Sequence, residues 1–213
     1  MARSFWTNSG KLQPGLAGAI FFCVLGVSAG IVSGQVAPSS PLVETGQISM
    51  AGRPVPYRIR NLPVNAFPDL PAPIAEALTE RGCLIPQTYE AKRPENVIHG
   101  SLERAGSNDW AVLCSAQGRV KLLVFFASVV ADKPAVLADA AEMDRLQPHD
   151  LSGVLGFNWG IDPASPSRIH DAEAGMAHRP PLPDHDCVAD TTVDRQTVYH
   201  LYRNGAWDKV ELE

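Results

Sequence analysis

The residues best suited to chemistry gather in one stretch near the C-terminus of the chain. Between positions 170 and 187 it holds imidazole, carboxylate and thiol groups, carried by His170, Asp171, His178, Asp184, His185, Asp186 and Cys187. Such groups are the ligands of divalent transition metals. Their spacing matches neither a helical H-x-x-x-H nor a C-x-x-C signature. We therefore favour a solvated polar loop, predict no metal and no cofactor, and name as the alternative ligands His178, Asp184, His185 and Asp186.

Cys187 is the one candidate nucleophile in this stretch, because His185 lies two residues away and offers a base. Three aspartates surround the thiol in sequence, namely Asp184, Asp186 and Asp190. Their negative charge raises a thiol pKa and so disfavours the reactive thiolate. The chain also has no G-x-S-x-G, G-x-G-x-x-G or Walker sequence. We therefore assign no catalytic residue.

Three aromatic residues offer a different kind of site. Trp159, Tyr202 and Trp207 could form a platform for a sugar or a peptide. The alternative is that they stabilise a hairpin or complete the core, because single surface aromatics are normal.

The most regular pattern, which must provide the scaffold, lies between residues 96 and 126. Its residues alternate in polarity, with turns at Gly106 and Gly118. If Gln117 and Gly118 form a two-residue turn, one face is wholly apolar, made by Ala111, Leu113, Val120, Leu122, Val124 and Phe126. The pattern predicts a three-stranded meander at the centre of a sheet.

Other elements follow from local signals. Residues 71–83 have a helical apolar stripe that ends at Gly82, and residues 133–147 are interpreted as a second helix. Asn204-Gly205 predicts a hairpin in which Tyr202 lies opposite Trp207. We expect an α+β fold whose mainly antiparallel sheet of five to seven strands is built from hairpins, with one or two helices packed on one face.

The N-terminal third is not typical of a folded core. A basic start, an apolar run from Leu16 to Gly34 and small residues at its end are typical of a secretory signal peptide; an uncleaved anchor is the alternative. Eight prolines between Pro38 and Pro73 predict an extended leader, with residues 55–62 as an edge strand. The predicted organisation is a signal peptide (1–34), a leader (35–68) and one α+β domain (69–213).

Charge and cysteine content bear on location and partners. The net charge is −5 and no stretch is dense in Lys or Arg, so we expect neither nucleic acid nor stable membrane insertion after cleavage. An exported, periplasmic or extracellular location allows disulfides to persist. Cys83 and Cys114 lie in apolar company and are paired on that ground, with Cys187 unpaired, although three cysteines allow three single bridges.

The elements "RGCLIPQ", "DWAVLCS" and "YHLYRNGAW" resemble a family of secreted bacterial proteins of unknown activity. The resemblance implies a bridge between Cys83 and Cys114, because both lie within the shared elements, but it implies no reaction. We expect a non-catalytic binding or accessory module of the cell envelope with a protein or glycan ligand. The alternatives are a small hydrolase or metal-dependent enzyme using residues 170–187, and an inhibitor of a secreted enzyme.

Overall fold

The computed structural model describes residues 41–175 and 182–211, which all lie within one compact unit, Ala37–Glu213. The expected signal peptide and the start of the expected leader lie outside the described residues, as does His178. The described part is α+β and rich in strands, and its sheets are mainly antiparallel.

The described strands form two sheets. The first, sheet A, has nine strands: β1 (Leu42–Met50), β2 (Arg53–Pro63), β3 (Leu84–Gln87), β4 (Val97–Gly100), β5 (Asp109–Ala116), β6 (Arg119–Phe125), β7 (Ala135–Ala141), β8 (Leu146–Pro148) and β9 (Leu155–Phe157). Its order is β7-β6-β5-β3-β2-β9-β8, with β1 added on β2 and β4 on β5. The pairing of β2 with β9 is parallel. Sheet B has four strands in the order β10 (Trp159–Ala164), β11 (Cys187–Thr192), β12 (Gln196–Arg203) and β13 (Ala206–Glu211).

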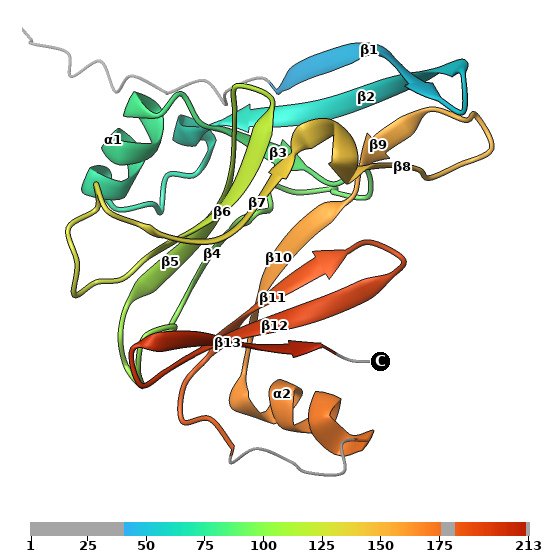
Figure 1. Cartoon of the computed structure of the whole chain (residues 1–213). Helices are drawn as coiled ribbons and strands as arrows, with labels where there is room; N and C mark the ends of the chain where they lie inside the picture. The colour runs from blue at the N-terminus through green and yellow to red at the C-terminus, as the bar shows by residue number, and fades with distance from the viewer. Residues whose placement is uncertain (1–40, 176–181, 212–213) are drawn as a thin grey trace, which may run out of the picture. The chain divides into compact units, whose positions relative to one another are not determined.

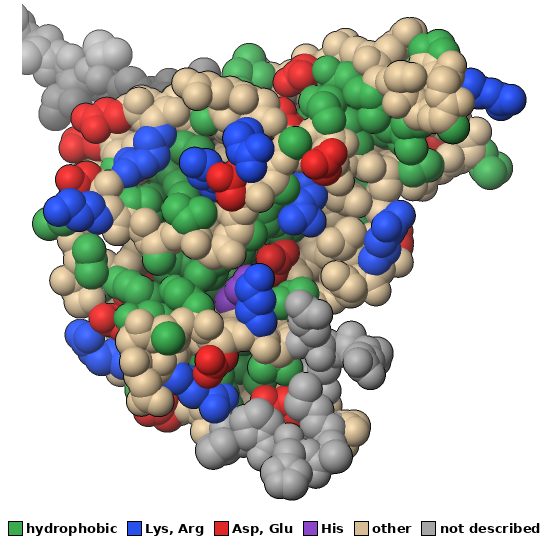
Figure 2. Space-filling model, in the orientation of Figure 1, with side chains coloured by type: hydrophobic (Ala, Val, Ile, Leu, Met, Phe, Trp, Pro, Cys, Tyr) green, Lys and Arg blue, Asp and Glu red, His purple; other side chains and the backbone are tan. Residues whose placement is uncertain are grey.

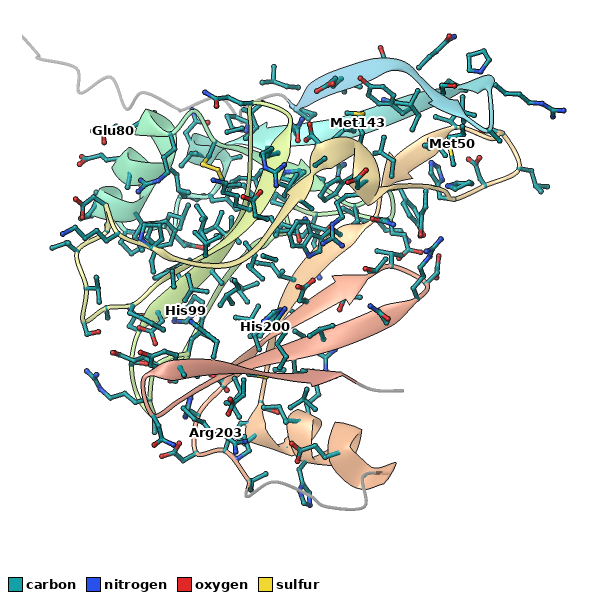
Figure 3. The ribbon with its side chains drawn as sticks, viewed as in Figure 1. Met50, Glu80, His99, Met143, His200 and Arg203 are labelled. Carbon is teal, nitrogen blue, oxygen red and sulfur yellow. A yellow bond between two sulfur atoms is a disulfide. The ribbon has the colours of Figure 1, made fainter. Side chains whose placement is uncertain are left out.

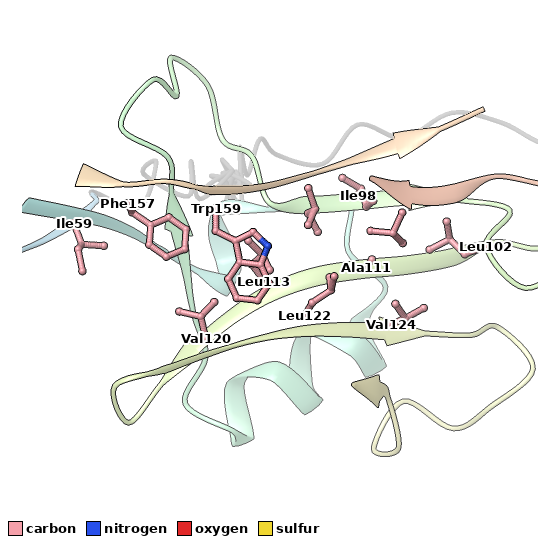
Figure 4. Close-up of a cluster of buried hydrophobic side chains, with 12 residues drawn as sticks. Ile59, Ile98, Leu102, Ala111, Leu113, Val120, Leu122, Val124, Phe157 and Trp159 are labelled. Atoms are coloured by element: carbon pink, nitrogen blue, oxygen red, sulfur yellow. The ribbon is translucent and has the colours of Figure 1, made fainter. Parts of the chain in front are cut away.

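The two sheets face each other and each carries a helix on its outer side (Figure 1). The central core lies between the sheets and joins Leu113 and Leu122 of sheet A to Trp159 and Val188 of sheet B (Figure 4). Helix α1 (Ala72–Glu80) covers the other face of sheet A, and α2 (Pro166–Ala172) covers the other face of sheet B. The helices therefore lie on two different faces, which corrects the expectation that they share one.

The predicted meander is confirmed as β4, β5 and β6. Gln117 and Gly118 both have positive φ, 55° and 72°, as a type I′ turn requires. The predicted apolar face lies in the central core, with Phe126 packed at its margin. The opposite face packs on α1 through Val112, Cys114, Leu123 and Phe125.

The first strand pair overturns the expected leader. Strands β1 and β2 form a long hairpin, and Ile59 of β2 is fully buried in the central core. Strand β2 is not an edge strand, because it also pairs with β3 and β9. Pro54 and Pro56 lie in the first part of β2, which pairs with β1 and with no other described strand. Because no second strand pairs with this part of β2, the missing N–H groups of the two prolines cost no hydrogen bond to such a strand.

The expected helix over residues 133–147 is also wrong. Residues Ala135–Ala141 form strand β7, which pairs antiparallel with β6, and Glu142–Arg145 form a 3₁₀ turn. The pairing requirement of the sheet outweighs the helix propensity of alanine. A helix, α2, occurs instead at Pro166–Ala172 and includes the first residues of the stretch interpreted as a polar loop. Ser165 caps this helix by accepting a hydrogen bond from Arg168 N, and Pro166 stands at its start.

A disulfide joins Cys83 to Cys114, as predicted, and fastens the segment after α1 to β5. The C-terminal hairpin is confirmed in its predicted register, with Tyr202 opposite Trp207. Tyr199, Leu201 and Val210 share the face that packs on α2. Within residues 41–175 and 182–211, none of the helices has the length and apolar character needed to span a bilayer.

Candidate functional site

Within the predicted metal segment, Asp184, His185 and Asp186 form structural contacts. The Nδ1 of His185 lies 2.7 Å from Asp184 Oδ1, and its Nε2 donates to the backbone oxygen of Tyr202 at 2.8 Å. Asp186 forms two hydrogen bonds with Ser101. Its backbone N donates to the Ser101 carbonyl at 3.0 Å, and its Oδ2 accepts from Ser101 N at 3.1 Å. Both ring nitrogens of His185 are thus engaged. In the described segments no three His, Cys, Asp or Glu side chains come together as a metal site would require.

The Cys187 thiol lies in the core between sheet B and α2, not in the polar setting that its sequence neighbours indicate. Burial, with a further contribution from the charge of Asp186, raises the pKa of this thiol to about 12. The predicted direction is therefore confirmed, although burial is the main cause. A neutral, buried thiol is a poor nucleophile.

Trp159 is a core residue rather than part of a surface platform. Its ring is fully buried, and its Nε1 donates to Asp190 Oδ1 at 2.6 Å. The other oxygen of Asp190 lies 3.0 Å from His200 Nε2, and the guanidinium of Arg145 lies 4.0 Å from the centroid of the Trp159 ring. Figure 3 shows His200 between the layers. The two hydrogen bonds join neighbouring strands of sheet B, and Arg145, which directly precedes β8 of sheet A, connects the Trp159 ring to the other sheet.

Tyr202 and Trp207 contribute to an aromatic cluster at one end of the sandwich. Their ring centroids lie 5.1 Å apart, and both pack against Phe126, at 4.7 and 5.7 Å. Because Phe126 follows β6 of sheet A, the cluster joins the C-terminal hairpin to sheet A. These contacts agree with the alternative stated for the aromatic residues, namely that they stabilise a hairpin and complete the core.

A surface hollow beside α1 was not predicted from the sequence. It lies between α1 and the segment that follows β6, has a volume of about 770 Å³ and is lined mainly by apolar side chains. We call it the α1 groove and define it by its lining residues: Pro71, Pro73, Ile74, Glu76, Ala77, Glu80, Asn108, Trp110, Phe125, Phe126, Ala127 and residues 129–132. Figure 2 shows hydrophobic side chains gathered below α1, and Figure 3 labels Glu80 at the end of that helix. Val129 and Val130 on its wall are 47% and 65% exposed.

A second hollow, of about 730 Å³, lies on the other side of Trp110. It shares Asn108 and Trp110 with the α1 groove and is otherwise lined by residues 66–70, Pro94, Val97 and His99. The ring of His99 packs on Trp110 with centroids 5.1 Å apart. Trp110 is therefore the common wall of two adjoining hollows.

The charged lining of both hollows has one sign. Glu76, Glu80 and Asp132 line the α1 groove and Asp69 lines the second hollow, whereas no Lys or Arg lines either. None of these four carboxylates forms an ion pair with a described residue. An apolar floor with unpaired acids at its margin favours a ligand that is both apolar and positively charged.

Two polar anchors hold the walls of the groove in place. Asp109, which is fully buried, accepts the backbone N–H of Ala127 through Oδ1 at 2.8 Å. Its Oδ2 accepts the N–H groups of Leu102 and Glu103 at 2.9 and 2.8 Å, as well as the Ser107 hydroxyl. Arg81, which does not itself line the groove, donates to the carbonyls of two lining residues, Ala77 and Asp132, at 2.7 and 2.5 Å.

The groove could not be predicted from the sequence, because its walls come from three separate stretches of the chain. The signal that was present is the apolar sequence of residues 125–131 continuing beyond the strand, which leaves Val129 and Val130 with no place in a core.

Comparison with family models, with curated proteins and with solved structures found no match to this chain. The resemblance to secreted bacterial proteins therefore stays a prediction. The functional assignment accordingly rests on the geometry of the described residues.

Proposed function

We propose that the protein is a non-catalytic binding module of the cell envelope, whose α1 groove takes an apolar, positively charged segment of a partner protein. The observation that carries the proposal is the charge of the lining: three carboxylates line the α1 groove beside an apolar floor and a fourth lines the adjoining hollow, whereas no Lys or Arg lines either. A disulfide between Cys83 and Cys114 supports export, because such bonds persist in oxidising compartments.

The size and chemistry of the groove suit a peptide segment. A volume of about 770 Å³ lies in the range of ligand-binding clefts and accommodates a few side chains. Val129 and Val130 offer apolar surface that no other described element covers. Glu76 and Glu80 lie four residues apart on α1, on the same side of the helix, so they present two carboxylates in line along its axis.

The walls are held in place before any partner arrives. Asp109 fixes the start of the 126–132 segment, and Arg81 ties its end to α1. A preorganised groove loses less conformational entropy on binding than a mobile one. The enzyme alternative that uses residues 170–187 stays a prediction, because His178 lies outside the described residues. An inhibitor of a secreted enzyme would use the same groove if that enzyme displays a cationic, apolar loop.

The proposal is tested with three synthetic peptides of equal length: one alternates leucine with lysine, one replaces every lysine by glutamate, and one replaces every leucine by serine. Binding is measured by fluorescence anisotropy, and the site is located by amide NMR shifts. We expect the leucine–lysine peptide alone to bind and to shift residues 74–80 and 126–132. Binding should weaken as salt is raised.

The matched variants separate local from global charge. The double variant Glu76→Lys/Glu80→Lys should weaken the leucine–lysine peptide by about tenfold, because exposed ion pairs contribute up to about 1 kcal/mol each. Asp208→Lys adds positive charge at an exposed position of β13, outside the groove. It should change the affinity by less than about twofold after correction for the different change in net charge of the two variants. Equal weakening by both variants, or amide shifts remote from the groove, would rule the proposal out.

A further inference from the structure

A second pocket, remote from the α1 groove along sheet A, has the opposite charge. It has a volume of about 390 Å³ and lies where β2 meets β3 and β9. Its lining includes Arg58, Arg60, Tyr89, His149, Asp150 and Ser152. Neither the α1 groove nor the hollow beside it is lined by an arginine.

The two arginines are brought together by strand geometry. Residues two apart on a strand point to the same face, so Arg58 and Arg60 share a face while Ile59 between them enters the central core. Neither arginine forms an ion pair with a described carboxylate. Arg60 is held by a 2.7 Å hydrogen bond from Nη2 to the carbonyl of Ala91, which leaves its remaining N–H groups for a ligand. Two like charges on one face repel, and a bound anion would relieve that repulsion.

The opposite wall is rigid and depends on a glycine. The rings of Tyr89 and His149 stack with centroids 4.6 Å apart and planes 13° from parallel. The Tyr89 hydroxyl donates to Asp194 Oδ2 at 2.6 Å and accepts from Gln147 Nε2 at 3.0 Å. A Cβ at Gly156 would lie 2.6 Å from Tyr89 Cβ and 2.8 Å from His149 Cδ2. Only glycine at position 156 lets this wall lie against β9.

One acid lines the pocket but its carboxylate is already engaged. Asp150 Oδ1 accepts from Ser152 N at 2.8 Å and from Ser152 Oγ at 2.5 Å, and Oδ2 lies 3.6 Å from His149 Nδ1. The hydrogen bonds from Ser152 lower the pKa of Asp150, so this carboxyl stays ionised. The fixed charges of the lining therefore comprise two guanidinium groups and one carboxylate, an excess of positive charge.

From this arrangement we infer that the Arg58–Arg60 pocket binds an oxyanion group, a phosphate, sulfate or carboxylate, carried by a small molecule. Guanidinium groups recognise such oxyanions through paired, charge-assisted hydrogen bonds. The volume lies at the lower end of the range for ligand pockets, which suits one anionic group on a body of monosaccharide size. The inference is independent of the proposed function, because none of the residues that define the α1 groove lines this pocket.

The test uses the whole chain and three probes: inorganic phosphate, inorganic sulfate and acetate. Each is titrated at low ionic strength and followed by amide NMR. We expect saturable shifts in residues 58–60, 87–91 and 149–152 with at least one probe. Preference for phosphate or sulfate identifies an ester as the natural ligand, and preference for acetate identifies a carboxylic acid.

Variants decide whether the pocket or general charge is responsible. Arg58→Ala should weaken the best probe by about tenfold, because a charge-assisted hydrogen bond is lost, and Arg58→Lys should recover part of that loss. Arg53→Ala, at the end of the same strand, removes the same charge outside the pocket and should change affinity by less than about twofold. Urea unfolding midpoints check that each variant is folded. The absence of saturable shifts with all three probes, or equal weakening by Arg53→Ala and Arg58→Ala, would overturn the inference.

Discussion

The buried carboxylate of Asp109 should contribute more to stability than the ion-paired acids of the protein surface. It accepts four hydrogen bonds, three at Oδ2 and one at Oδ1, from donors in two loops. Asp109→Asn keeps the shape of the side chain but turns one oxygen into an N–H donor. With the amide oxygen facing the three donors, the new NH₂ group faces the N–H of Ala127, whose bond is lost.

The magnitude follows from that lost bond. A hydrogen bond to a charged acceptor contributes about 1.5–3 kcal/mol, and a buried donor left unpaired costs about 1–3 kcal/mol. The remaining three bonds also weaken, because their acceptor becomes neutral. We expect Asp109→Asn to lower the free energy of unfolding by about 3–4 kcal/mol. Since Ala127 begins the wall of the α1 groove, its amide should also exchange faster with solvent.

Urea denaturation measures the stability change, and hydrogen exchange at Leu102, Glu103 and Ala127 measures the local one. Asp139→Asn is the matched control, because Asp139 forms only surface ion pairs, at 2.8 Å to Arg119 and 3.7 Å to Lys121. Its cost should stay below about 1 kcal/mol. If Asp109→Asn costs no more than this control, the carboxylate does not organise the two loops and the reasoning is refuted.

Three further predictions concern the sulfur atoms and a buried acid. Replacing Cys83 and Cys114 together by alanine should destabilise the protein by about 4 kcal/mol in urea denaturation, because the bridge closes a 31-residue separation; a loss below about 1 kcal/mol would contradict this. Cys187 should resist iodoacetamide at mildly alkaline pH in the native protein and react once it is unfolded, as mass spectrometry would show, because burial raises its pKa to about 12. Burial also raises the pKa of Glu142, against a smaller lowering by the hydrogen bond from Ser115. The folded state therefore binds this proton more tightly than the unfolded state. The contribution of Glu142 to the free energy of unfolding falls as the pH rises from the pKa of the unfolded state to the higher pKa of the folded state. Glu142→Gln should flatten that dependence and stabilise the protein at neutral pH; an unchanged pH profile of the unfolding midpoint would count against it.

The parts of the fold that local patterns dictate were predictable. The β5–β6 hairpin follows from alternation around a Gln117-Gly118 turn, and the C-terminal hairpin follows from Asn204-Gly205. Both signals are local, because a two-residue turn fixes the register of the strands on either side of it. The bridge between Cys83 and Cys114 was predicted because both residues lie in apolar company in the sequence, and the structure places both in the core between α1 and sheet A.

The failures arise where contacts distant in sequence decide. Residues Ala135–Ala141 have helical propensity but become a strand because β6 offers them a free edge. The prolines of β2 argue against a central strand, yet Pro54 and Pro56 lie outside the portion that pairs with β3 and β9, and Pro63 is the last residue of the strand. The α1 groove combines residues from α1, β5 and the segment after β6, a combination that no single window of sequence contains. The Arg58–Arg60 pair was readable in "YRIRNL", but its stacked wall of Tyr89 and His149 was not.

The division of the chain between the two sheets sets an order of events during synthesis. Sheet A uses described residues up to Phe157, and sheet B begins at Trp159 and is built from the C-terminal part of the chain. When the last strand of sheet A has emerged, the apolar face that contains Leu113 and Leu122 has as yet no cover. At ordinary synthesis rates, the stretch from Trp159 to Glu211 that holds sheet B takes about 3–10 s to appear. During that interval the nascent chain exposes an apolar surface, and a chaperone that shields this surface would raise the yield of folded molecules.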